Sequence, residues 1–145
     1  MIELVAPLTA MGFAVEPLRR GDAKRLFAAW CEAFCCAVKL RTGRYRHGSY
    51  HWHAFSFELV KALGERKALD QYLALQPEAV VVIPESWKKD GPGVRLAGLP
   101  LPDLTFLRAD LYVFPESMDW SMAFTHEQPE IGPYFTWRDW CRFAG

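Results

Sequence analysis

The sequence predicts a single α+β domain, with a mostly antiparallel sheet of about four strands and helices packed on one face. The length of 145 residues and the hydrophobic content of 51% are those of one globular domain. Helix-like and strand-like segments follow one another without the strict alternation that is typical of a doubly wound fold. No internal repeat or linker divides the chain, so we expect residues 1–145 to fold as one unit.

The N-terminal part is predicted to contain an extended arm and one long helix. Prolines and glycines interrupt residues 1–21, which leaves an arm with at most a short strand at 12–16. From 23 to 40, apolar side chains recur every three or four residues and include Trp30. This spacing predicts an amphipathic helix with one buried face, which ends before Thr42-Gly43.

The middle of the chain is predicted to hold two strands and a second helix. Aromatic residues with period-two character predict a strand over 50–59, after a polar loop at 41–49. The apolar positions of 64–75 predict a helix that Pro77 terminates. The β-branched run within 78–84 is typical of a central strand.

The C-terminal part is predicted to contain a long loop, a hairpin and an aromatic tail. Glycines and prolines punctuate residues 87–105, so we expect a loop with a minor strand at 94–96. The apolar runs 110–114 and 120–125 are separated by five residues, which suits a β-hairpin. In the tail, residues 137–145, we expect a closing helical turn because aromatic residues stand three apart. These are Trp137, Trp140 and Phe143.

Charge and targeting signals argue against several classes of function. Lys and Arg total 17, as do Asp and Glu, so the chain has no net field to attract nucleic acid. The four cysteines contain no CxxC pair, the N-terminus shows no secretory signal, and no apolar run approaches about 20 residues. We therefore expect a cytoplasmic protein with no cofactor and no membrane partner. A nucleic-acid or small-ligand module would have to rest on Arg41, Arg44, Tyr45 and Arg46.

Histidines and one carboxylate are the basis of an enzymatic alternative. The dipeptide His126-Glu127 offers a general acid–base pair, which His53 would join from the predicted strand at 50–59. This set predicts, as the alternative function, a small metal- or histidine-dependent hydrolase. Its candidate metal ligands are His51, His53 and His126. In the competing structural interpretation, which we favour, His53 and His126 hydrogen-bond across the sheet and Glu127 points into solvent.

Four motifs occur in order within residues 22–136. They are WHAFS at 52–56, DLYV at 110–113, WSMAFTHE at 120–127 and GPYF at 132–135. Their order and spacing resemble those of the domain-of-unknown-function family 4275, a group of small bacterial proteins. Ser121 stands where the family pattern has Thr, and the Pro/Gly-rich segment 91–102 has no counterpart in it. The resemblance implies one shared fold and important residues in these motifs, and it brings no established activity.

The sequence favours a non-enzymatic bacterial protein that acts by binding another protein. Aromatic residues make up 14% of the chain, and Trp and Tyr contribute strongly at protein interfaces. We expect the binding surface on two long loops, 41–50 and 87–102. The most concrete form of this role is an immunity or antitoxin-like protein that occludes a cognate toxin. The candidate binding residues are Tyr45, Trp87, Tyr134 and Phe135.

Overall fold

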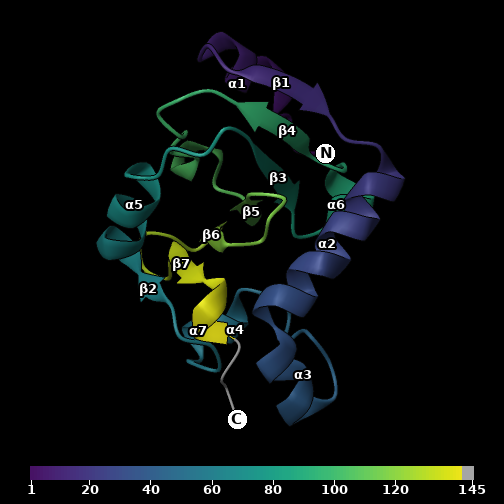
Figure 1. The fold of residues 1–145 in the computed structure, drawn as a ribbon, viewed down its shortest axis with the longest axis vertical. Coiled ribbons are helices and arrows are strands. Elements are labelled where there is room, and N and C mark those ends of the chain that lie inside the picture. Colours follow the sequence, from purple (N-terminus) through teal and green to yellow (C-terminus); the bar gives the residue numbers. More distant parts are fainter. Residues whose placement is uncertain (142–145) are drawn as a thin grey trace.

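One antiparallel sheet forms the centre of the molecule (Figure 1). The structure is a computed structural model, and it describes residues 1–141. Within these residues the sheet has seven strands in the order β1-β4-β3-β5-β6-β7-β2, and every neighbouring pair is antiparallel. The strands are β1 (Ala14–Pro17), β2 (Leu63–Gly64), β3 (Val80–Pro84), β4 (Val94–Ala97), β5 (Leu111–Phe114), β6 (Trp120–Phe124) and β7 (Tyr134–Trp137).

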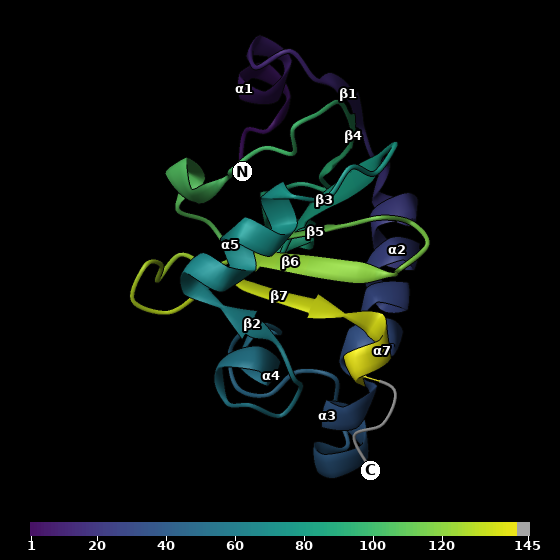
Figure 2. The same ribbon diagram turned by 60° about the vertical axis from the view of Figure 1, so that its left-hand side comes forward.

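Helices lie on both sides of this sheet. Figure 2 shows the long helix α2 on one side and α5 on the other. The described helices are α1 (Val5–Ala10), α2 (Arg20–Phe34), α3 (Cys36–Thr42), α4 (His53–Ser56), α5 (Glu65–Leu73), α6 (Trp87–Asp90), the 3-10 helix η1 (Thr105–Leu107) and α7 (Arg138–Cys141).

The sheet separates two hydrophobic cores, because successive side chains of a strand point to opposite faces. In β3, Val81 and Ile83 belong to the core that α2 covers. Val80 and Val82 belong to the other core, together with buried residues of α1 and α5. All five residues of β3 are buried, so the central strand predicted within 78–84 is confirmed.

The predicted α+β class is confirmed, but the predicted sheet is wrong in its size and in its covering. Within residues 1–141 it has seven strands rather than about four, and helices pack on both faces rather than on one. Two strands have no counterpart in the prediction. The strand β2 is two residues long, too short for any alternation to show. The strand β7 runs from the GPYF motif to Trp137, the first residue of the predicted tail.

The segment 50–59, predicted as a strand, instead contains turns and the short helix α4. A side chain of β5 holds its backbone in place, because the Trp52 N–H donates to the Tyr112 hydroxyl at 2.9 Å. The Trp52 side chain is buried in the core on the α2 side, and the Tyr50 ring stacks on it. The alternating aromatic pattern therefore comes from side chains that pack inward from a turn, not from a pleated strand.

The helix predicted over 23–40 is two helices. The first ends at Phe34 and the second begins at Cys36, with Cys35 between them outside helical geometry (φ −121°, ψ 14°). No proline or glycine stands at this position, so the residue pattern does not show the break. The second helix ends at Thr42, and the following Gly43 adopts the left-handed conformation (φ 82°) common after helix ends.

Several other elements match their predictions. The helix expected at 64–75 is α5, and the expected hairpin is the pair β5–β6. The minor strand expected at 94–96 is β4, which pairs with β3 on one side and β1 on the other. Residues 1–21 differ more, because they hold the helix α1 as well as β1 where an extended arm is predicted.

In the C-terminal tail, Trp137 ends β7 and Trp140 lies in the closing helix α7. Phe143, the third aromatic residue of the predicted turn, lies outside the described residues. None of the helices in residues 1–141 has both the length and the apolar character needed to cross a membrane.

Candidate functional site

Two carboxylates meet at one end of the sheet. Glu85 directly follows β3 and Asp110 directly precedes β5. Because β3 and β5 are antiparallel neighbours, these residues lie side by side, and the Glu85 backbone N–H donates to the Asp110 carbonyl at 2.9 Å. The turn that contains His51 and Trp52 supplies hydrogen-bond partners to both carboxylates.

Glu85 is a buried carboxylate with three hydrogen-bond partners. Its Oε2 is 2.5 Å from His51 Nδ1, and its Oε1 accepts from the His51 backbone N–H at 2.6 Å and the Tyr112 hydroxyl at 2.7 Å. Only 8% of the Glu85 side chain and 16% of the His51 side chain are exposed. Burial raises the pKa of Glu85, but the hydrogen bonds and charge of His51 and the Tyr112 hydroxyl hold it below its ordinary value. Glu85 therefore stays ionised and orients the His51 ring.

Asp110 forms a second network at the same end of the sheet. Its Oδ1 accepts from the Trp52 indole N–H at 2.9 Å and from the His126 backbone N–H at 3.0 Å. The His126 ring Nδ1 lies 2.9 Å from both carboxylate oxygens. Asp110 thus ties the Trp52 side chain to the backbone of the chain that leaves β6.

A pocket of about 540 Å³ opens beside Glu85 and His51. Tyr45, from the loop after α3, and Trp87, the first residue of α6, both line it, so we name it the Tyr45–Trp87 pocket. Glu85 is the only acid among its described lining residues, and its charge is already engaged by His51. Four basic residues also line the pocket: Lys24, Arg46, Lys88 and Lys89. The pocket is therefore electropositive in a chain without net charge, and it would attract anionic groups.

Charged neighbours hold the two aromatic rings of this pocket in place. The Tyr45 hydroxyl donates to Glu32 Oε2 at 2.8 Å, and Lys39 Nζ lies 4.6 Å from the centre of the Tyr45 ring. Lys88 Nζ lies 5.6 Å from the centre of the Trp87 ring. Both rings are only partly buried, so their remaining surface is available to a partner.

Cys31 also lines the Tyr45–Trp87 pocket, but its chemistry is that of a packed thiol. Burial, with a smaller contribution from the charge of Glu85, raises its pKa to about 12. The Cys31 thiol therefore stays protonated near neutral pH, and the thiolate, not the thiol, is the nucleophilic form of cysteine.

Within residues 1–141, no side-chain hydrogen bond or ion pair links the three residues of the hydrolase alternative, His53, His126 and Glu127. His126 pairs with Asp110, and Glu127 is exposed. His53 and His126 both lie against the ring of Trp52, but no hydrogen bond joins them in the described part of the chain. Burial lowers the pKa of His53, although the nearby charge of Glu127 opposes this shift.

The alternative metal ligands, His51, His53 and His126, are likewise not arranged around one point. The Nδ1 atoms of His51 and His126 face different carboxylates, those of Glu85 and Asp110. Across residues 1–141, no three His, Cys, Asp or Glu side chains are placed to hold one metal ion. The geometry therefore gives no support to the metal-dependent form of the hydrolase.

Tyr134 and Phe135, the other two candidate binding residues, lie in the core. Phe135 is fully buried between the rings of Trp120 and Trp137. Tyr134 is 9% exposed and packs against Trp52 on the opposite face of the sheet. The structure thus brings Tyr45, Trp87 and His51 to one pocket and places the GPYF aromatics in the packing of β7.

Glu85 and Asp110 organise the site, but sequence reasoning missed Glu85 and included Asp110 only as the first residue of the DLYV motif, without a role. Each is a carboxylate at the end of a fully buried apolar strand, and that pattern is visible in the sequence. Their partners come from distant segments, so the pairing itself becomes visible only in the fold.

Comparison with family models, with curated proteins and with solved structures finds no match to this chain. The resemblance to family 4275 therefore stays a prediction.

Proposed function

We propose that this chain acts by binding another protein and that the Tyr45–Trp87 pocket is the centre of the interface. The observation that supports this is the meeting of two partly exposed aromatic rings, from distant segments, beside four cations. Trp, Tyr and Arg are the side chains that contribute most binding energy in protein interfaces. Arg46 adds the third of these types to the same wall.

The charges of the pocket favour an acidic partner. The four basic side chains around its wall would meet Asp or Glu side chains of the partner and accelerate association. His51 and Glu85 lie deeper and form a rigid base, because both are hydrogen-bonded and largely buried. A partner carboxylate that enters the pocket would thus face a preformed surface rather than a mobile one.

The most concrete form of this proposal is an immunity or antitoxin-like protein that occludes a cognate toxin. Occlusion requires an interface of about 1,200–2,000 Å² in total, with aromatic anchors near its middle. A pocket of about 540 Å³ that receives one or two partner side chains suits the middle of such an interface. The surrounding contact area would come from α2, α6 and the loop after α3.

The test is the affinity for the protein encoded next to this chain, measured by titration calorimetry. Replacing Trp87 by Ala should weaken binding by about ten- to a hundred-fold, because truncation of a central tryptophan costs about 2 kcal/mol or more. The double substitution of Lys88 and Lys89 by Ala should mainly slow association with the partner. The difference in association rate between this variant and the wild type should shrink in high salt.

Phe57→Ala is the matched control, because Phe57 is another exposed aromatic residue (58% exposed) that does not line the pocket. Its affinity should equal that of the wild type. If the neighbouring gene product does not bind, or if Trp87→Ala and Phe57→Ala bind equally well, the proposal is wrong.

A further inference from the structure

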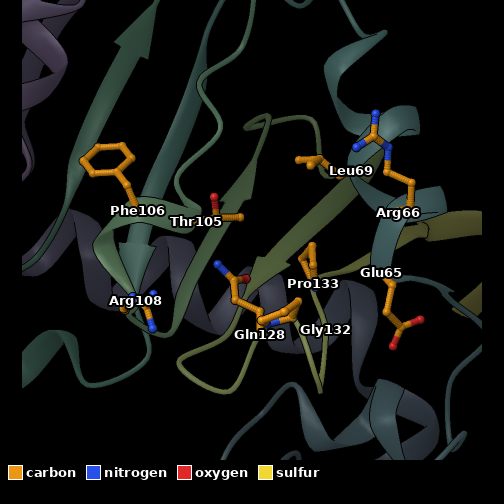
Figure 3. Close-up of a pocket in the computed structure, with 10 residues that line it drawn as sticks. Glu65, Arg66, Leu69, Thr105, Phe106, Arg108, Gln128, Gly132 and Pro133 are labelled. Carbon is orange, nitrogen blue, oxygen red and sulfur yellow. The ribbon is translucent and has the colours of Figure 1, made fainter.

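A second pocket, of about 560 Å³, lies on the opposite side of the sheet, between the start of α5, the helix η1 and the loop 128–133. Figure 3 shows the residues that line it. Leu69, Phe106, Pro129 and Pro133 give it a largely apolar wall. Its volume is within the range of small-molecule sites. This pocket shares no lining residue with the Tyr45–Trp87 pocket, so a ligand here would bind independently of the proposed protein interface.

One polar group in this wall lacks a partner. The Thr125 backbone N–H donates to Gln128 Oε1 at 3.2 Å, which fixes the orientation of the Gln128 amide. The other amide atom, Nε2, is buried and has no hydrogen-bond partner, and it is the only such side-chain atom found in residues 1–141. A buried donor without an acceptor costs free energy, which a ligand oxygen could recover.

The charges around the pocket indicate whether the ligand oxygen that accepts from Gln128 would be charged or neutral. Arg66 and Arg108 line the pocket, against one acid, Glu65. Arg66 pairs with Asp70 at 3.0 Å, whereas Arg108 makes no ion pair or hydrogen bond through its side chain within the described residues. Figure 3 shows the Glu65 carboxylate directed away from Gln128. The balance of charge therefore favours a negatively charged acceptor.

We propose that this pocket binds a small carboxylic acid with an apolar body. The apolar body would lie against Leu69, Pro129 and Pro133. Gln128 Nε2 is buried in the unliganded chain, so the pocket wall would shift slightly on binding to let the carboxylate accept a hydrogen bond from it. Thr105 contributes a hydroxyl on the same wall, and Arg108 supplies a neutralising charge. Hydrogen bonds to an ionised acceptor are the stronger kind, which is why a carboxylate suits the unpaired amide better than a neutral carbonyl.

Phenylacetate and hexanoate are suitable probes, each titrated into the full chain and followed by NMR of backbone and Gln side-chain amides. We expect both acids to shift the signals of Gln128 and of residues in α5 and η1. Phenylacetamide has nearly the shape of phenylacetate without its charge, and it should bind more weakly. If neither acid shifts these signals, the proposed site is wrong. If phenylacetamide binds as tightly as phenylacetate, the proposed preference for a carboxylate is wrong.

Gln128→Glu tests the role of the amide. The new carboxylate keeps an acceptor for the Thr125 N–H but removes the donor, so phenylacetate should bind about tenfold or more weakly. Gln76→Glu makes the same chemical change at an exposed residue outside this pocket, and it should bind as the wild type does. Equal affinity of the two variants would overturn the proposed contact, and equal melting temperatures would show that both remain folded.

Discussion

Trp30 is one of the largest fully buried side chains in the core on the α2 side. Its side chain is fully buried, its ring lies 4.5 Å from that of Tyr112, and its indole N–H donates to the Ser121 hydroxyl at 2.8 Å. We expect Trp30→Ala to lower the free energy of unfolding by about 3–5 kcal/mol. Trp30→Phe should cost less because most of the volume remains filled. Urea denaturation measures both, and a loss below about 1 kcal/mol for the Ala variant would contradict this assignment.

Asp110 is expected to matter more for stability than its partner His126. Asp110→Ala leaves the Trp52 indole and the His126 backbone N–H without their acceptor, which should cost about 2 kcal/mol or more. His126→Ala removes a ring that is 37% exposed, and it should cost about 1 kcal/mol or less. Glu127→Ala, at an exposed position, should change stability by about 0.5 kcal/mol at most. Thermal melts of the three variants give the ranking, and a larger loss for His126→Ala would reverse it.

Glu85 should make stability depend on pH in the acid range. Its pKa in the folded chain lies below the ordinary value of 4.5, so the folded state favours the ionised form. The resulting stabilisation is complete above the unfolded pKa and disappears as the pH falls through the lower folded pKa. Between about pH 7 and pH 3, the free energy of unfolding should therefore fall less steeply in Glu85→Gln than in the wild type. Equal slopes in urea denaturation would show that other carboxylates carry the effect.

The junction between β3 and β4 depends on Gly93. Gly93 has φ +92°, and a Cβ at this position would overlap the Val82 carbonyl oxygen. Gly43, after α3, has a similar φ of +82° but open space around it. Gly43→Ala should thus cost only the conformational strain, about 1 kcal/mol. Gly93→Ala adds a clash with the β3 backbone and should cost clearly more, as unfolding curves of the two variants will show. Equal losses would mean that strain alone matters at Gly93.

The elements that the sequence predicts well are those with a long, regular pattern. The helix predicted at 64–75 has the helical periodicity of a buried face. The strand within 78–84 and the two strands of the hairpin have the apolar runs of buried strands. The strand expected at 50–59 fails for a physical reason, since aromatic side chains that enter a core from a turn also alternate in sequence. The site follows the same rule: His51, Tyr45 and Trp87 are conspicuous by type, whereas pairing with Glu85 depends on tertiary contacts.

For the whole molecule, a sheet between two cores predicts a single cooperative unfolding transition. Trp30 and Trp52 lie in one core and Trp120 in the other, and both cores share the strands β3, β5 and β6. Loss of either core would expose one face of the same strands, so neither should survive alone. Unfolding followed by tryptophan fluorescence and by far-UV circular dichroism should therefore coincide. Separate midpoints would show that the α1–β1 end or another part melts independently.

The two edge strands of the sheet limit how the backbone of another chain can pair with it. At one edge, β1 has four residues and ends in Pro17, which lacks the N–H that strand pairing needs. At the other edge, β2 offers two residues. Neither edge strand is long enough to serve as a template for a strand of another chain. High protein concentration should therefore not lead to edge-to-edge fibril formation. The protein partner proposed above would instead have to recognise side chains, so its selectivity would depend on a few surface residues rather than on backbone pairing.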